Sequence, residues 1–235
     1  MTMVPYPAVA QLDRVPDSCS GGRGFESRQL YQDPGGRMGF RDFEYRKRTV
    51  LILSERANQT GRMENQHMTM ELRKWSPALK QELIGICNAV DRTFLSNRMP
   101  YPYTEEAADW WLEMVSEHDG KDGVFRAIVV DGKVAGNISV EQKADVYSRD
   151  AEIGYLLLTK YWSKGIMTEA VRQICKLAFT ELDIIRITGL VYEPNIASQR
   201  VLEKSGFVRE GLQKNAVWKD GRVYDLCLYG KLKQQ

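Results

Sequence analysis

The stretch Glu152-Ile-Gly-Tyr-Leu-Leu-Leu-Thr-Lys-Tyr-Trp-Ser-Lys-Gly-Ile-Met-Thr-Glu-Ala170 decides how this chain folds. Its apolar first part predicts a buried strand, and a short turn around Gly165 then leads into a helical pattern. The start of a helix leaves backbone N–H groups without intrahelical acceptors, so this junction predicts a turn that binds an anion such as phosphate. Gly165 permits close approach of the backbone, and Lys164 adds positive charge.

The segments on either side of this stretch predict an α+β domain that covers residues 63–235. Two short turns, Asp131-Gly132-Lys133 and Lys219-Asp220-Gly221, are hairpin signals. Ser76-Pro77 and Thr104-Glu105 are typical helix starts. The expected elements are a strand over 70–75, helices from Ser76 and Thr104, strands over 124–130, 134–140 and 151–158, a helix over 167–182, a strand over 186–191, a helix over 196–205, and strands over 207–218 and 222–232. This order contains one parallel crossover around the long helix.

Composition is typical of a soluble globular protein. Of the 235 residues, 43% are hydrophobic and 27% are charged, which is enough for a packed core. The net charge of +2 argues against a dedicated nucleic-acid surface, since such a surface needs a concentrated basic face. The sequence has neither an apolar run of about 18 residues nor a basic-then-apolar leader, so we expect a cytoplasmic protein without a membrane partner.

The cysteines Cys19, Cys87, Cys175 and Cys227 lie far apart, and His67 and His118 are the only histidines. No zinc-site spacing can be built from these residues. We therefore expect buried free thiols and no metal.

Residues 1–62 differ from the rest of the chain. They are rich in proline and glycine pairs and show no sustained strand or helix period. Such a segment cannot bury a core of its own. The segments 9–12 and 24–28 also resemble the translated conserved arms of a transfer-RNA gene. We therefore expect either a disordered extension or a spurious one from an over-extended gene model, in which case translation starts at Met63, Met68 or Met70.

Three motifs carry a family resemblance. They are the turn with its preceding Glu152-Ile-Gly-Tyr, the stretch Asn195-Ile-Ala-Ser198, and Val-Leu-Glu-Lys-Ser-Gly-Phe207. Together they resemble the GNAT superfamily of acetyl-CoA-dependent N-acetyltransferases, and more narrowly the Rim-type branch, which includes enzymes that acetylate the amino termini of ribosomal proteins. The likeness covers residues 70–231. It implies a mixed, mostly antiparallel sheet of about seven strands with about four helices, in which strands 4 and 5 form one parallel, splayed pair.

The resemblance also implies that acetyl-CoA binds along this stretch as a cosubstrate. The backbone of Leu156, Leu157 and Leu158 would pair with the pantetheine arm, and an N–H there would polarise the thioester carbonyl, a contribution of roughly 3–4 kcal/mol. Asn195 would contact the pantetheine, and its position also fits a helix N-cap. The residues that would hold the pyrophosphate are Ser163, Lys164, Gly165, Ile166, Met167 and Thr168.

Two positions depart from the family pattern. Met167 stands where glycine or alanine is common, and Leu202 stands where a tyrosine often protonates the leaving thiolate. Ser198 is the substitute that the Rim-type branch suggests, and the alternative is a small residue in the first turn of a helix. Asn137 could point into the substrate groove.

The base follows from the chemistry of the amine, which attacks only when it is neutral. At pH 7 a lysine amine costs about 4.6 kcal/mol to deprotonate, but an α-amino group costs only about 1.4 kcal/mol, so a modest base suffices for an amino terminus. Glu152 is the candidate, because strand alternation places it on one face with Gly154 and Leu156. The alternative is a structural carboxylate paired with an arginine such as Arg186.

Several other residues have simpler interpretations. Glu169 complements the dipole of the helix that it begins, and His118 does the same at a helix end. Trp110, Trp111 and Trp162 are expected in the core or in the wall of the site.

We therefore expect direct acetyl transfer in a ternary complex to a primary amine, with the α-amino group of a protein favoured. A small amine or polyamine is the alternative acceptor, and the segments 92–103 and 142–149 would shape that choice. A catalytically silent acyl-CoA-binding interaction module is the alternative from another class. The sequence is compatible with a monomer or a homodimer.

Overall fold

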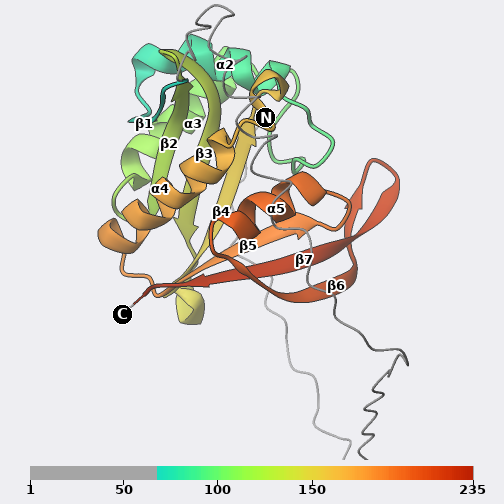
Figure 1. Cartoon of the computed structure of the whole chain (residues 1–235). Coiled ribbons are helices and arrows are strands. Elements are labelled where there is room, and N and C mark those ends of the chain that lie inside the picture. Colours follow the sequence, from blue (N-terminus) through green and yellow to red (C-terminus); the bar gives the residue numbers. More distant parts are fainter. Residues whose placement is uncertain (1–67, 235) are drawn as a thin grey trace, which may run out of the picture. The chain divides into compact units, whose positions relative to one another are not determined.

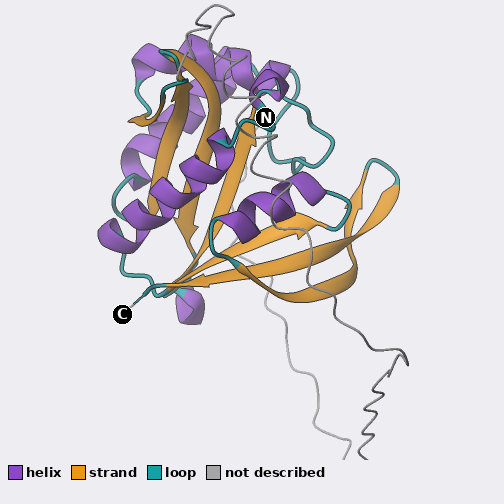
Figure 2. Cartoon of the chain, viewed as in Figure 1, coloured by secondary structure: helices purple, strands orange, loops and turns teal. Residues whose placement is uncertain are grey.

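The computed structural model describes residues 68–234, which form a seven-stranded sheet with helices on both faces (Figures 1 and 2). The strand order is β1-β2-β3-β4-β5-β7-β6, and β4 and β5 are the parallel pair in an otherwise antiparallel sheet. The predicted α+β class is confirmed. The strands are β1 (Met70–Lys74), β2 (Gly123–Val130), β3 (Lys133–Gln142), β4 (Asp150–Leu157), β5 (Arg186–Tyr192), β6 (Val208–Lys219) and β7 (Arg222–Leu232), and the α-helices are α2 (Lys80–Ala89), α3 (Glu105–His118), α4 (Ile166–Glu181) and α5 (Ile196–Lys204).

The predictions for residues 1–62, the boundary at residue 63 and the state of Cys19 lie outside the described residues. Within the described part, no helix is long and apolar enough to cross a membrane.

Local sequence signals explain most element boundaries. Thr104 caps α3 as predicted, because its hydroxyl accepts a hydrogen bond from the Ala107 N–H. Ser76 stands at the N-cap position before Pro77, as predicted, but its side chain makes no capping hydrogen bond. The chain after Ser76 first forms a 3-10 turn over Pro77–Leu79, and the α-helix begins only at Lys80. The fixed φ of proline suits this first turn, whichever type of helix follows.

Both predicted hairpins are confirmed. Asp131 and Gly132 have φ angles of 48° and 76°, and Asp220 and Gly221 have φ angles of 50° and 76°. Left-handed backbone at both central residues is the signature of a type I′ turn, which matches the twist of the flanking strands.

The sheet separates two hydrophobic cores. One core packs α4 and α5 against β1–β5 and β7, and the other packs α2 and α3 against the opposite face of β2 and β3, together with Trp75 after β1 (Figure 1). Every residue of β2 is buried, as expected for a central strand that is covered on both faces. Cys87, Cys175 and Cys227 are buried and free, which confirms the predicted thiols among the described residues.

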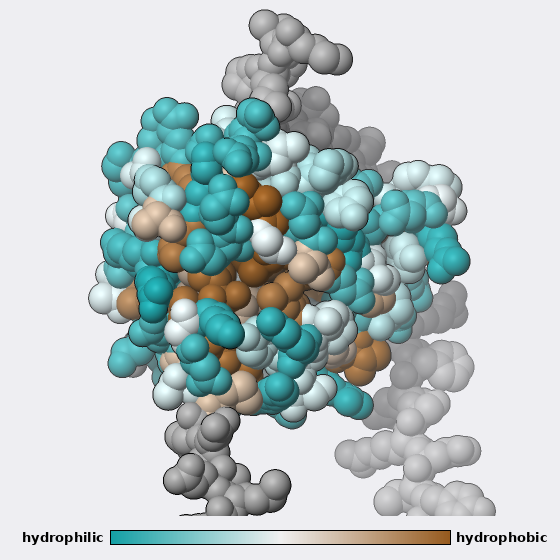
Figure 3. Space-filling view, turned by 90° about the horizontal axis from the view of Figure 1, so that it is seen from above, coloured by the Kyte–Doolittle hydropathy of each residue, from teal (hydrophilic) through white to brown (hydrophobic). Residues whose placement is uncertain are grey.

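The parallel pair parts soon after it begins. Its register covers only Asp150–Glu152 on β4, which face 186–188 on β5. Beyond Glu152 the two strands diverge in Figure 1, as the family resemblance implied. The space-filling view from above shows hydrophobic side chains gathered in the middle of that face and bordered by hydrophilic ones (Figure 3).

Candidate active site

The turn before α4 exposes backbone amides. Gly165 is the N-cap of α4 with a φ of 78°, and Ser163 is also left-handed with a φ of 58°. The first intrahelical bond runs from the Glu169 N–H to the Gly165 carbonyl at 3.1 Å, so the preceding N–H groups have no intrahelical acceptor. A glycine cap offers no side chain to occupy them. These amides and the positive end of the helix dipole suit an anion.

Two lysines add positive charge to this turn. The Nζ atoms of Lys160 and Lys164 lie 5.1 Å and 5.8 Å from the ring centroid of Tyr161. Both contacts are of the cation–π type, which draws the ammonium groups to the same ring. The turn can therefore attract a polyanion through side-chain charge as well as through amides.

Met167 does not obstruct the turn. Its side chain is only 8% exposed and belongs to the core beneath α4. The helix geometry therefore directs this larger side chain away from the exposed amides. This explains how a methionine fits where the family pattern commonly has glycine or alanine.

The gap between β4 and β5 presents particular backbone groups. The Leu158 N–H donates to the Ala135 carbonyl, and the Leu158 carbonyl accepts from the Tyr161 N–H, both at 2.9 Å. Because successive residues of a strand direct their backbone groups to opposite sides, Leu156 also faces β3, whereas Tyr155 and Leu157 face β5. The Leu157 carbonyl accepts from the Trp162 Nε1 at 2.8 Å. Of the three leucines expected to pair with pantetheine, only Leu157 therefore directs its N–H towards the gap.

Glu152 stands where the gap begins, and its side chain reaches solvent. The protein around the carboxylate reduces its hydration, and this is the largest cause that raises the pKa of Glu152. Lys143 and Arg98 oppose the shift, while Glu141 and Asp150 add to it. A carboxylate with a raised pKa is a better proton acceptor than an ordinary one.

Arg186 is not the arginine that pairs with Glu152, whereas Arg98 attracts the Glu152 charge, so a structural pair with another arginine stays an alternative. Arg186 instead donates to both carboxylate oxygens of Glu210, one of them at 2.9 Å, and its Nε lies 3.8 Å from Asp150. Gly230 makes room for this pair, since a Cβ there would lie 2.3 Å from Glu210 Oε1.

Ser198 has a partner that the sequence did not reveal. Its Oγ lies 2.7 Å from the hydroxyl oxygen of Tyr155, so a hydrogen bond joins α5 to β4. Burial is the main cause that raises the pKa of Tyr155 to about 12, and the bond to Ser198 partly opposes it. The Tyr155 hydroxyl therefore stays protonated, and the hydrogen bond holds the Ser198 hydroxyl in one orientation.

Asn195 and Leu202 both belong to the α5 region, Asn195 as its N-cap and Leu202 within the helix. The Asn195 Oδ1 accepts from the Ser198 N–H at 3.1 Å, which confirms the predicted N-cap. Leu202 is buried against β5, where a Cβ at Gly189 would lie 2.7 Å from its Cδ1. Leu202 is thus a core residue.

The remaining candidates mostly have structural partners. Glu169 contacts Arg172 at 3.7 Å and accepts from Gln173 at 3.0 Å, in keeping with a helix-stabilising role. Asn137 accepts from the Trp75 Nε1 at 2.8 Å. His118 lies at the end of α3, with its Nδ1 2.7 Å from Asp122.

The three tryptophans differ in exposure. Trp111 packs edge to face on Trp75 at 5.4 Å, within the second core. Trp110 is 53% exposed, so a core position is wrong for it. Trp162 is 46% exposed and forms a wall of the turn through its bond to Leu157.

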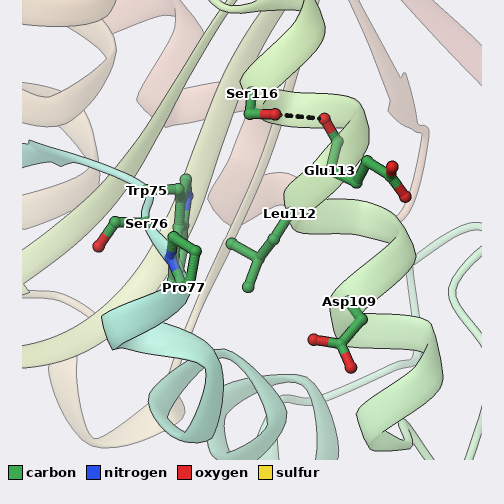
Figure 4. A pocket seen from close by; sticks show the side chains of 7 residues that line it. All are labelled: Trp75, Ser76, Pro77, Asp109, Leu112, Glu113 and Ser116. Atoms are coloured by element: carbon green, nitrogen blue, oxygen red, sulfur yellow. Dashed lines mark hydrogen bonds between the residues drawn. The ribbon is translucent and has the colours of Figure 1, made fainter.

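A separate pocket of about 310 Å³ lies between the end of β1 and α3. Leu112 points from α3 towards Trp75 and Pro77 in Figure 4. Asp109, Glu113, Ser76 and Ser116 complete the lining. None of these residues belongs to the turn, to β4 or to α5, so the pocket is distinct from the candidate site. Among the described residues no cluster of His, Cys, Asp or Glu is arranged to hold a metal.

The fold and this site define an acetyltransferase of the GNAT class. The family model described as "Acetyltransferase (GNAT) domain" matches residues 69–208, so the chain belongs to that family.

Particular relatives agree with the Rim-type resemblance. The YdaF protein of Bacillus subtilis (strain 168), whose name provisionally describes it as a ribosomal N-acetyltransferase, is 28% identical over 176 residues, which are 73% of this chain and 94% of that protein. The ribosomal-protein-S5-alanine acetyltransferase from Vibrio fischeri has a similar structure, with a TM-score of 0.59, 25% identity, and coverage of 72% of this chain and 94% of that one. RimL, an acetyltransferase of ribosomal L7/L12 solved with coenzyme A, shares the fold at a TM-score of 0.60 and 24% identity, over 70% and 94% of the two chains.

Proposed function

We propose that this protein transfers an acetyl group from acetyl-CoA to a primary amine, by direct transfer in a ternary complex, and that the favoured acceptor is the α-amino group of a protein. The observation that carries the proposal is the parting of β4 and β5 immediately after Glu152, with the exposed amides of the α4 turn at the far end of β4. A long anionic cosubstrate and a carboxylate base can meet in such a gap.

The residues around the turn suit the cosubstrate. The amides from Gly165 to Thr168 would bind the pyrophosphate with help from Lys164 and Ser163. The Leu157 N–H would meet the pantetheine or the thioester carbonyl in the gap, and Asn195 would lie beside the pantetheine. When bound, acetyl-CoA supplies the activated acetyl group.

Glu152 would take the proton from the acceptor ammonium and leave a neutral amine ready to attack. An α-amino group costs only about 1.4 kcal/mol to deprotonate at pH 7, whereas a lysine side chain costs about 4.6 kcal/mol. A carboxylate, even with a raised pKa, is adequate for the first acceptor and weak for the second. This difference is why we favour an amino terminus.

Ser198 and Tyr155 would act on the departing sulfur. Because the pKa of Tyr155 is raised to about 12, it lies well above the value of about 8.5 for an ordinary thiol. Full proton donation to the thiolate is therefore uphill. Tyr155 can instead donate to the Ser198 Oγ, which leaves the Ser198 hydroxyl proton free to form a hydrogen bond to sulfur.

The test is release of free thiol from acetyl-CoA with three matched acceptors. The first is a peptide with a free amino terminus and no lysine, the second is the same peptide with a blocked amino terminus and one lysine, and the third is a polyamine. The proposal predicts the highest kcat/KM for the first peptide. Preference for the polyamine would show that the acceptor is a small amine and not a protein. If none of the three acceptors caused release of free thiol, a catalytically silent binding module would be favoured.

A further inference from the structure

Glu141 lies directly opposite Glu152. The antiparallel register of β3 and β4 pairs these two residues, and Cα atoms of such partners are about 4.5–5.5 Å apart. Paired residues present their side chains on the same face of the sheet. The Ser139 Oγ also donates to the Glu141 Oε1 at 2.9 Å, which holds the Glu141 carboxylate on this face. Two carboxylates therefore share the start of the gap.

This arrangement is unfavourable for folding by itself, since like charges directly opposite each other repel. Lys143 and Arg98 attract the Glu152 charge, and each attracts it more than Glu141 repels it. Lys143 lies 2.6 Å from Asp150. Arg98, from the segment before α3, attracts the Glu152 charge, and Asp150 repels it. On the β5 side the facing residue is Thr188, whose hydroxyl donates to Asp150 at 2.8 Å.

We propose that Glu141 is a positioning residue for acetyl transfer, which makes Glu152 a stronger base and draws the positively charged acceptor amine towards it. The protons and bonds balance as follows. The acceptor ammonium gives one proton to Glu152, and the neutral amine then forms the C–N bond as the C–S bond breaks. The second proton of the nitrogen passes to the departing thiolate, Glu152 later releases its proton to solvent, and Glu141 keeps its charge throughout. This inference rests on the proposed function, because it needs Glu152 to be the base.

The direct test is the variant Glu141→Gln, which keeps the shape and can still accept from Ser139. Loss of the Glu141 charge should lower the pKa of Glu152. The acid limb of the pH profile, which is the fall of kcat/KM as the pH decreases, should therefore move to lower pH. The expected shift is about 0.5–1 pH unit, as for two unit charges about 6 Å apart in a partly solvated site. The weaker base should also lower the pH-independent value of kcat/KM above the acid limb about two- to threefold.

Two controls separate this effect from general damage. Glu141→Asp keeps the charge and should leave the acid limb close to the wild-type position. Glu169→Gln removes an exposed carboxylate on α4 that contacts Arg172 and Gln173, and it should leave the profile unchanged. The thermal midpoint of Glu141→Gln should equal or exceed that of the wild type, because a repulsion is removed while activity falls.

The inference and the proposed function fail in different ways. An unchanged acid limb in Glu141→Gln, combined with loss of turnover in Glu152→Gln, would overturn the role of Glu141 and leave the base in place. If Glu152→Gln kept the wild-type turnover and the wild-type pH profile, Glu152 would not be the base. The proposed role of Glu141 would then be wrong as well. A lower thermal midpoint together with an unmoved limb would make Glu141 a structural residue only.

Discussion

The two faces of β4 differ sharply in chemistry. On one face, Glu152 is open to solvent and stands among charged groups, including Glu141 across the strand pair. On the other face, Tyr155 is packed against the core of α4 and α5 and forms a neutral hydrogen bond with Ser198. The difference shows how a strand with a side-chain period of two can supply a proton acceptor on one face of the sheet and hydrogen-bond donors on the other.

The largest effect is expected on the charged face. Glu152→Gln removes the proposed base, so kcat should fall about 100-fold or more at pH 7 while the Kd for acetyl-CoA stays unchanged. Steady-state kinetics and calorimetry measure both quantities. A fall in coenzyme affinity that matches the loss of rate would assign Glu152 to binding instead.

The same variant tests the stability of that face. A raised pKa means that folded Glu152 binds its proton more tightly than unfolded Glu152, so the wild type gains stability as pH falls through the raised pKa. This stability is lost as pH rises through the raised pKa, so at pH 7 Glu152→Gln should unfold at a higher temperature than the wild type. The difference should shrink below the ordinary glutamate pKa of about 4.3. A lower midpoint at pH 7 would contradict the raised pKa.

The turn at the end of β4 should show the next largest effect. Gly165→Ala places a side chain on left-handed backbone, and the resulting strain of about 1–2 kcal/mol should disturb the amides and weaken coenzyme binding about tenfold. Gly132→Ala is a matched control, because Gly132 has a φ of 76° in a distant hairpin with nothing within 4 Å of the added Cβ. Equal losses of coenzyme affinity in both variants would show an effect of stability alone.

A smaller effect is expected on the neutral face. Tyr155→Phe and Ser198→Ala should each lower kcat about tenfold with little change in KM. Ser198→Ala removes the hydrogen bond to the departing sulfur, and Tyr155→Phe removes the hydrogen bond that orients the Ser198 hydroxyl. Since the two hydroxyls act as a unit, the double variant should be no worse than the worse single variant. Strictly multiplicative losses in a double-mutant cycle would separate their roles.

The smallest effect concerns surface charge beside the turn. Lys164→Ala should weaken coenzyme binding about twofold at low salt, and the difference should fade as ionic strength rises. Lys176→Ala, an exposed position further along α4, should have no effect. A loss in Lys164→Ala that persists at high salt would point to a direct contact.

Local signals made much of the fold predictable. The two type I′ turns need positive φ at two adjacent residues, and the Asp-Gly dipeptide in each turn is enough to predict this conformation. The cap of α3 by Thr104 is equally local. Ser76 shows the limit, because a favourable cap residue before proline does not specify whether the first turn is α or 3-10.

The candidate site was less predictable where it depends on distant residues. Tyr155 and Ser198 are 43 positions apart, and nothing at either position indicates the other. The neighbourhood of Glu141 and Glu152 follows from the strand register, which a sequence pattern does not fix to the residue. The same register decides that Leu157, and neither Leu156 nor Leu158, directs its N–H into the gap.

The most direct test of the two-face mechanism is the pH dependence of single-turnover acetyl transfer, with enzyme preloaded with acetyl-CoA and an amino-terminal peptide added in excess. Glu152→Gln should lose the acid limb, because the group that titrates there is gone. Tyr155→Phe should lower the plateau and keep the midpoint of the wild-type limb. An acid limb that persists in Glu152→Gln, or one that shifts in Tyr155→Phe, would contradict the separate roles of the two faces of β4, namely proton acceptance by Glu152 and hydrogen bonding by Tyr155 and Ser198.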